Sequence, residues 1–430
     1  MNFLCGAARE IITPPVGTLL YGYQPDLAST SVHDDLTATA IAFSSGTDTA
    51  LLVSVTVGDI QTELDRALRA EMASACGVPA DRIILAATHT HCAPNVSGVA
   101  GWGEIDRPYI DTILRPALCR AARSAVDAVI PAELAVTHGE SRVGINRRQQ
   151  LRDGQVRLGQ NPWGCCDPTM TVISVRAQDG GRGIVHLIHY GCHGTACGRS
   201  TGITRDWPGT MIDRVEAQTG TLTAFFNGAI GDVGPRLTNG STTGNIRHVE
   251  ELGGVAAFDA MRILNQPKVF TVPSLALHTG TVRLPYQPHP PLEEVRRALA
   301  QIAHPDALIN HARLRYTYLK SVESLLLRGE TRVPDDFSYP VTMVTVGGVV
   351  LIPIPFEFFA EISMRLRAGS PVPYTLGLSC ANGYRAYLPT QDQLCRGGYE
   401  VAVFRYASRY SLADNTDQHL INEIFRILDA

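Results

Sequence analysis

Arg82-Ile-Ile-Leu-Ala-Ala-Thr88 is a short, continuous apolar run, which is typical of a strand that is covered on both faces. The segments around it alternate between β-branched strand patterns and helical patterns. Ala40 to Val57 predicts two strands around a polar turn, Thr62 to Cys76 predicts a helix, and Pro108 to Val129 predicts a long amphipathic helix. We therefore predict an α/β fold with a mixed central sheet flanked by helices.

The rest of the chain continues this alternation. Further strands are predicted at Thr169–Ala177, Gly183–Tyr190, Leu222–Asn227, Ser274–Leu284 and Val341–Pro353. Pro291 to Arg328 carries apolar residues at helical spacing together with many charges, which predicts a helical excursion near residues 290–330. Because no internal repeat or linker is evident, we predict a single domain over residues 1–430, with a helical insertion at about 286–330.

The overall charge and hydropathy exclude several classes of protein. The 430 residues include 37 Lys and Arg against 41 Asp and Glu, so no strong positive field would attract nucleic acid. The strongly apolar run 341–356 contains Gly347-Gly348 and two prolines and is shorter than the about 20 residues of a membrane-spanning helix. It predicts a hairpin, and we expect no stable membrane association. Since residues 1–10 lack an export pattern, we also expect a cytoplasmic location.

Ten cysteines are scattered along the chain, with one adjacent pair and no Cys-x-x-Cys motif. This pattern predicts reduced, mostly buried thiols rather than disulfides. Cys192 and Cys197 lie near a histidine, but the four residues between them disfavour a ribbon-type zinc site.

Histidines follow two of the predicted strands. His89 and His91 come directly after the first apolar run, and in extended chain two residues at this spacing point to the same face. They could reach one metal or one reacting group, or they could be histidines hydrogen-bonded locally. His193 stands between glycines at the end of another strand, where ligands gather in α/β folds, and is the third candidate. His186 and His189 lie within that strand and are interpreted as packing residues.

Glu357 follows an apolar strand and two prolines, where a helix is predicted to begin. A glutamate in the first turn could simply favour the helix dipole. Its apolar surroundings indicate instead that an ionised carboxylate there needs a cation or strong donors. Tyr384, Tyr387 and Tyr399 follow later, and on composition alone they are ordinary packing residues.

Taken in order, these segments resemble the catalytic domain of the neutral/alkaline non-lysosomal ceramidases, the neutral ceramidase family. The resemblance covers nearly the whole chain. The matching segments are Gly6–Pro15, Thr88–Pro94, Asn146-Arg147, His193-Gly-Thr195, Asp206-Trp-Pro-Gly209, Gly231-Asp-Val233 and the Asn-x-Tyr-x-x-Tyr segment at Asn382.

The resemblance implies a zinc ion whose bound water attacks an amide. The ligands that it implies are His89, His193, Glu357 and Tyr387, with Tyr384 as the competing tyrosine. The residues that it places around the reacting carbonyl are His91, Arg147 and Tyr399. Independently of the resemblance, two imidazoles, a carboxylate and a phenol oxygen suit zinc, and a catalytic site would leave one position open for water. We therefore expect a zinc-dependent amidohydrolase.

The chain departs from the family pattern in ways that affect the expected substrate. Gly234 stands where ceramidases carry the serine of Gly-Asp-Val-Ser-Pro, so no serine nucleophile is expected. From the end at Ala430 and the pattern of residues 1–10 we expect neither the extra C-terminal domain of ceramidases nor an export signal. These departures favour a small soluble amide over membrane ceramide.

Two other functions are compatible with the sequence. The same metal site could serve acyl transfer or cyclisation in a specialised biosynthetic pathway, or the fold could persist as a non-catalytic binding scaffold. The oligomeric state is open, although soluble enzymes are often homo-oligomers.

Overall fold

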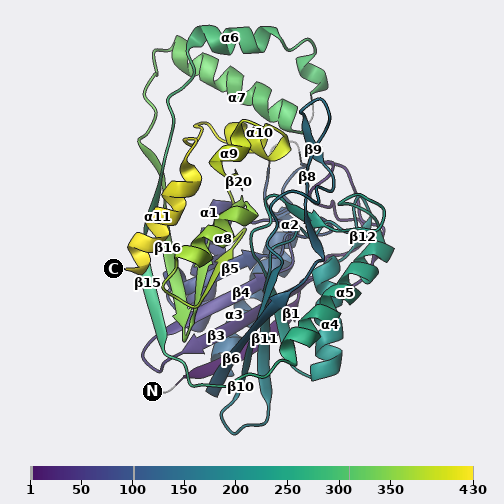
Figure 1. The fold of residues 1–430 in the computed structure, drawn as a ribbon, viewed down its shortest axis with the longest axis vertical. Coiled ribbons are helices and arrows are strands. Elements are labelled where there is room, and N and C mark those ends of the chain that lie inside the picture. Colours follow the sequence, from purple (N-terminus) through teal and green to yellow (C-terminus); the bar gives the residue numbers. More distant parts are fainter. Residues whose placement is uncertain (1–2, 100–101, 309, 430) are drawn as a thin grey trace.

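The computed structural model describes residues 3–99, 102–308 and 310–429. Its largest sheet has eight strands in the order β13-β11-β10-β6-β1-β3-β4-β5 (Figure 1). The β11–β13 and β4–β5 pairs are parallel, whereas the other pairs are antiparallel, so the sheet is mixed as predicted. The strands are β1 (Leu4–Ile11), β3 (Thr37–Ser44), β4 (Thr49–Val55), β5 (Ile83–Ala87), β6 (Ile130–Glu140), β10 (Thr169–Ala177), β11 (Gly183–Tyr190) and β13 (Leu222–Asn227).

A second sheet packs against one face of the first. Its strands, in spatial order, are β15 (Leu275–Pro285), β16 (Asp336–Val346), β17 (Val349–Pro353) and β19 (Tyr374–Leu378). Phe43 and Phe226 of the large sheet share one buried apolar cluster with Val344 and Leu376 of the small one. The turn between β16 and β17 is at Gly347-Gly348, which confirms the predicted hairpin.

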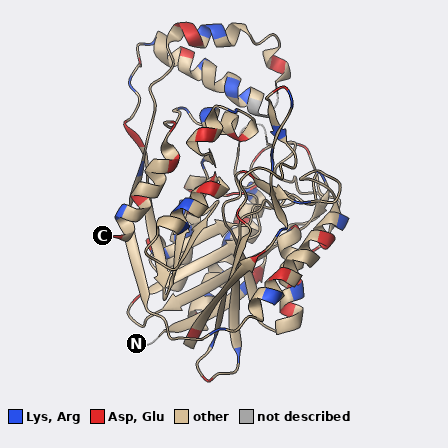
Figure 2. Ribbon diagram, viewed as in Figure 1, with Lys and Arg blue, Asp and Glu red and all other residues tan. Residues whose placement is uncertain are grey.

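Helices cover the opposite face of the large sheet. Alternate residues of β3 and β4, such as Ala40 and Val53, pack with α1 (Thr62–Cys76) and α3 (Arg115–Asp127). Alternate residues of β11 and β13, such as Ile188 and Phe225, pack with α4 (Trp207–Thr219) and α5 (Ile246–Leu264). The large sheet is therefore buried on both faces, and its strands are largely uncharged, whereas charged residues lie mostly on outer helices and loops (Figure 2).

The remaining elements are short or peripheral. The helices are α2 (Arg107–Tyr109), α6 (Leu292–Ala300), α7 (Asn310–Leu327), α8 (Ala360–Gly369), α9 (Gln391–Leu394), α10 (Tyr399–Tyr406) and α11 (Thr416–Leu428). The strands are β2 (Ser31–Val32), β7 (Gly144–Asn146), β8 (Arg148–Gln150), β9 (Val156–Leu158), β12 (Gly202–Ile203), β14 (Val233–Pro235), β18 (Phe356–Phe358) and β20 (Ala386–Leu388). Among the described residues, no helix is long and apolar enough to cross a membrane.

The helical excursion near residues 290–330 is confirmed. It consists of α6 and α7, which lie between β15 and β16 in the chain and form the top of the view in Figure 1. Leu314 of α7 packs in one cluster with Val403 of α10. The division into a single domain with an insertion stays a prediction, as do the cytoplasmic location and the homo-oligomer.

One local prediction is wrong, and another is confirmed with a local irregularity. The helix predicted to begin at Glu357 begins only at Ala360, because residues 356–358 pair in parallel with residues 386–388 as strands β18 and β20. The long helix predicted from Pro108 to Val129 is confirmed as continuous helical structure from Arg107 to Asp127, which contains a π-helical turn over Ile110–Leu114. This turn ends just before Pro116, which has no N–H to donate to a regular helical hydrogen bond.

The cysteine prediction is confirmed in its main point. All ten cysteines are free thiols. The expectation that most of them would be buried was too strong, because only five of the ten are buried. These are Cys5, Cys92, Cys192, Cys197 and Cys380.

Candidate metal centre

His89, His193 and Glu357 come from three distant segments of the chain and meet in the fold. His89 follows β5, His193 follows β11, and Glu357 lies in the middle of β18. A bridge between Thr90 and Gly194 draws the two histidine loops together. A Cβ at position 194 would lie 3.0 Å from the backbone oxygen of His89, so glycine permits this close approach. The sequence prediction that these three residues converge is confirmed.

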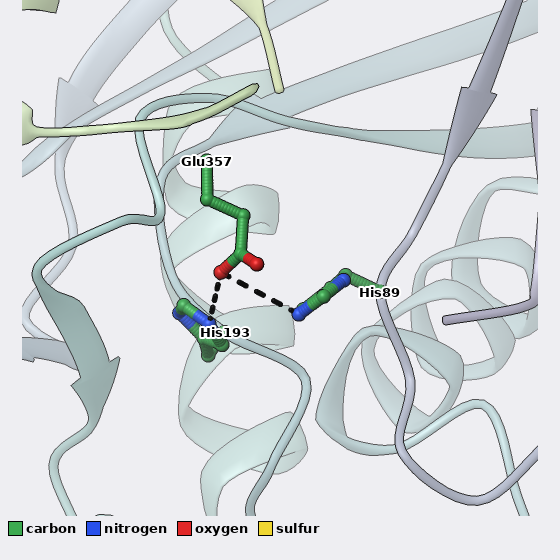
Figure 3. A group of neighbouring side chains, drawn as sticks. All are labelled: His89, His193 and Glu357. Atoms are coloured by element: carbon green, nitrogen blue, oxygen red, sulfur yellow. Dashed lines mark ion pairs between the residues drawn. The ribbon is translucent and has the colours of Figure 1, made fainter. Parts of the chain in front are cut away.

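The three side chains point their ligand atoms at one another, as Figure 3 shows. Glu357 Oε2 lies 2.7 Å from His193 Nε2 and 3.6 Å from His89 Nε2. One ligand atom from each residue falls within 4.8 Å of the other two, and all three residues are buried. This is the arrangement of a site that could hold a metal ion.

Backbone carbonyls fix the orientation of both imidazoles. His89 Nδ1 lies 2.7 Å from the oxygen of Gly58, and His193 Nδ1 lies 3.0 Å from the oxygen of Val233. A carbonyl oxygen only accepts, so each Nδ1 carries the proton and each Nε2 directs a lone pair toward Glu357. Metal-binding histidines are commonly oriented in this way.

Electrostatics keep the histidines neutral and the carboxylate charged. Burial lowers the pKa of His89, and it lowers the pKa of His193 to about 4 with help from the Arg147 guanidinium. Burial alone would raise the pKa of Glu357, but its neighbours, among them the charged guanidinium of Arg147, hold that pKa below its usual range. Neutral imidazoles and an ionised carboxylate are the forms that bind a metal.

The contact between His193 and Glu357 is the observation that favours a cation. Neither His193 Nε2 nor Glu357 Oε2 has a hydrogen-bond partner among the described residues, although the two atoms are close. With Nδ1 protonated, both atoms are acceptors, and two buried acceptors repel each other unless a cation lies between them. Two imidazole nitrogens and a carboxylate oxygen are ligands that suit zinc.

The two candidate tyrosines occupy different positions. Tyr384 donates its hydroxyl to Glu357 Oε1 at 2.8 Å and so orients the carboxylate. Tyr387 pairs with Glu357 across β18 and β20, and its ring stacks on the ring of His193 at 6.4 Å between centroids. Arg147 Nη2 donates to the Tyr387 hydroxyl at 2.8 Å. Tyr387 as the fourth ligand remains a prediction.

A cavity of about 1120 Å³ lies beside this centre. The three residues expected around the reacting carbonyl all line it: His91, Arg147 and Tyr399. His91 Nε2 lies 3.3 Å from His89 Nε2, whereas its Nδ1 has no hydrogen-bond partner among the described residues. Tyr387 also lines the cavity, so the expected reacting groups face the same space.

The same arrangement of elements occurs in two solved structures. One is the crystal structure of neutral ceramidase from Pseudomonas aeruginosa, which superimposes with a TM-score of 0.74 over 100% of this chain and 74% of that chain, at 18% identity. This is the neutral ceramidase fold. The other, a ceramidase complexed with C2, gives the same TM-score and coverage at 16% identity. The expected resemblance in fold is confirmed. No family model and no curated protein sequence matches the chain.

Within the neutral ceramidase-like fold, the serine position is closed. Gly234 lies on β14, and a Cβ there would meet Thr242 at 2.9 Å and the Cβ of Arg147 at 3.4 Å. A side chain at this position needs its neighbours to move. The packing therefore agrees with the expectation that no serine acts here.

Sequence reasoning assigned no role to two buried carboxylates beside the site. Glu400 accepts from Arg147 Nε at 2.8 Å and from Arg148 Nη1 at 2.7 Å, so it anchors the arginine on the cavity wall. Asp59 accepts a short hydrogen bond from Tyr21, whose ring packs on His91. Burial raises the pKa of Asp59 to about 7. In the sequence, Asp59 could have been recognised as a candidate site residue because it comes just after a predicted strand.

Proposed function

We propose that this chain is a zinc-dependent amidohydrolase that cleaves a linear amide, an N-acyl amine. The proposal rests on His193 Nε2 and Glu357 Oε2, two buried acceptor atoms that face each other without a hydrogen bond. A cation between them would remove their repulsion, and nitrogen and oxygen ligands of this kind suit zinc. The neutral ceramidase-like fold supports it. His89, His193, Glu357 and Tyr387 would hold the ion. When bound, zinc would polarise the amide carbonyl and lower the pKa of a water molecule.

Hydrolysis adds water across the C–N bond, so the oxygen goes to the acyl carbon and a proton goes to the amine nitrogen. His91 is placed to carry that proton, because it lines the cavity and lies next to His89. Burial, with the neighbouring His89 and His193, holds the pKa of His91 well below its usual range, so it is a neutral proton acceptor. Its Nδ1 is free of any hydrogen bond among the described residues.

Arg147 and Tyr399 would position the substrate carbonyl. Arg147 is buried and held by Glu400 and Tyr387, so its guanidinium is fixed before substrate arrives. Burial would lower the pKa of Arg147, but Tyr387 and Glu400 outweigh it and raise that pKa, so the charge is permanent. A fixed donor stabilises developing oxyanion charge without reorganising. Tyr399 begins α10 on the same wall, with its ring 5.6 Å from that of Tyr387.

We propose a small soluble amide, rather than membrane ceramide, as the substrate. Gly234 stands where ceramidases carry a serine, and its neighbours leave little room for a side chain. A substrate contact through a serine hydroxyl is therefore missing at this position. A cavity of about 1120 Å³ has room for a compact amide with a short acyl chain.

The experiment has two parts. Zinc per chain is measured on protein purified without chelator, for the wild type, His193→Ala and the exposed control His138→Ala. We expect about one zinc per chain in the wild type and control and a large loss in His193→Ala. A wild-type protein that binds no zinc, even after reloading, would contradict the proposal. It would favour the alternative that the protein is a non-catalytic binding scaffold.

Turnover in heavy-oxygen water identifies the reaction. We expect one labelled oxygen in the carboxylate product, because hydrolysis takes its oxygen from water. Product without label would indicate acyl transfer or cyclisation at the same site.

A further inference from the structure

The charged residues of the cavity wall are mostly arginines. Among the described lining residues, Asp153 is the only acidic one. The basic lining residues are Arg147, Arg157, Arg199 and Arg396. The chain as a whole has a formal net charge of -4, so this excess of positive charge is local to the cavity.

Three of these arginines come from separate segments. Arg157 lies on β9, Arg199 lies in the loop before β12, and Arg396 lies between α9 and α10. All three are exposed, and none makes an ion pair or a side-chain hydrogen bond with a described residue. Asp392, near Arg396, already accepts from Thr390 and Gln393.

Some exposed arginines elsewhere on this protein are paired, whereas others, such as Arg182, make no ion pair with a described residue. Arg142 pairs with Glu140 at 3.5 Å, and Arg426 pairs with Glu423 at 2.9 Å. Arg157, Arg199 and Arg396 lack such partners among the described residues, and they differ from other unpaired arginines in that all three line one cavity. Guanidinium groups match carboxylate and phosphate oxygens in geometry and charge, so a ligand with an anionic oxygen group would satisfy them.

The same cavity also has an apolar part. Trp102, Val156, Leu158 and Ala402 line it, and Leu158 is 53% exposed. A ligand that uses both parts would have an apolar segment and an anionic end. This combination disfavours a neutral N-acyl amine.

We infer that the substrate is an N-acyl amine whose amine portion bears an anionic oxygen group, carboxylate or phosphate, held by Arg157, Arg199 and Arg396. This inference rests on the proposed function for its reaction, and it names the substrate class of the same site. A carboxylate substrate of this class is an N-acyl amino acid, and its hydrolysis would release the free amino acid and a fatty acid.

The test uses mimics that cannot be hydrolysed, so that binding is measured apart from catalysis. In these mimics of N-hexanoylglycine a methylene replaces the amide NH, and the end group is a carboxylate, a phosphonate or a neutral carboxamide. Affinity for the protein as purified is measured by calorimetry at low salt. We expect at least one anionic mimic to bind about tenfold more tightly than the carboxamide, which corresponds to about 1.4 kcal/mol. The tighter of the two anions identifies the natural group.

Variants assign the preference to the arginines. In the triple variant Arg157→Gln, Arg199→Gln, Arg396→Gln the anionic mimics should lose their advantage, while affinity for the carboxamide should stay unchanged. Arg182→Gln is the matched control, since Arg182 is exposed and lies in the turn between β10 and β11, outside the cavity lining. The preference should also fall as salt is raised.

Three outcomes would overturn the inference: equal affinity for the charged and neutral mimics, a preference that survives in the triple variant, or no binding of any mimic at millimolar concentration. A failure of the proposed function looks different. N-hexanoylglycine would then not be cleaved, while the charged mimics would still bind through the arginines.

Discussion

Replacing His91 by alanine should leave zinc in place and slow hydrolysis. His91 Nε2 is 3.3 Å from His89 Nε2, and His91 is not part of the group formed by His89, His193 and Glu357. Zinc–nitrogen bonds are about 2.0–2.1 Å long, and the three other residues already supply converging ligand atoms. The proton transfer assigned to His91 typically contributes about 10²- to 10⁴-fold to a rate, or about 2.7–5.4 kcal/mol in activation free energy.

The His91→Ala variant should remain folded. The His91 ring packs beside Tyr21, Tyr23 and Trp102 with centroids 5.3, 5.0 and 5.9 Å away. Losing these contacts should cost about 1–3 kcal/mol of unfolding free energy, which is small for a protein with several large apolar clusters.

The assay combines zinc content per chain with kcat and KM on one N-acyl amine. His89→Ala serves as the comparison and should lose zinc and activity together. The expected signature of His91→Ala is full zinc, a fall in kcat of at least about 100-fold and a small change in KM. If His91→Ala loses zinc while His89→Ala retains it, the roles of the two histidines are exchanged and the reasoning is refuted.

Three further predictions concern the surrounding residues. Glu357→Gln should keep the Tyr384 hydrogen bond but weaken zinc affinity by more than about 100-fold, measured by competition with a chelator, and unchanged affinity would remove Glu357 from the ligand set. Glu400→Gln should lower the free energy of urea-induced unfolding by about 3 kcal/mol, because it leaves the buried guanidinium groups of Arg147 and Arg148 without a carboxylate, and a value near zero would contradict this account. Burial lowers the pKa of His186 to about 4, so the unfolded chain gains a proton below pH 6.5 that the folded chain does not, and stability falls as the pH falls. Between pH 7 and 5 the wild type should lose about 2 kcal/mol more unfolding free energy than His186→Asn, and parallel pH profiles would refute the assignment.

The sequence predicted the strands best where the apolar pattern was continuous. Thr169–Ala177, Gly183–Tyr190 and Leu222–Asn227 are strands with the predicted bounds. Each is buried on both faces of the sheet, so the same apolar requirement acts on every residue and leaves a clear pattern.

The sequence failed where distant pairing overrides local preference. Phe356-Glu357-Phe358 has no strand pattern of its own, and it becomes a strand because it pairs with Ala386–Leu388. Glu400 is similar, since its two arginine partners lie about 250 residues earlier in the chain. Such contacts depend on the folded arrangement, which no local periodicity encodes.

The candidate ligands were found by motif rather than by pattern. The resemblance to the neutral ceramidase family pointed to His89, His193 and Glu357 as ligands, and the structure brings them together. The substrate end of the site was not found in this way. Arg157, Arg199 and Arg396 belong to loops and short elements without a motif, and only their shared cavity relates them.

The excursion formed by α6 and α7 is linked to the cavity wall through the helix α10. It touches α10 through Leu314 and Val403, and α10 begins at Tyr399 on the cavity wall. None of its described residues lines the cavity or belongs to the His89, His193 and Glu357 group. A change in α6 or α7 would therefore act on the cavity indirectly, by shifting α10 and the Tyr399 side chain with it.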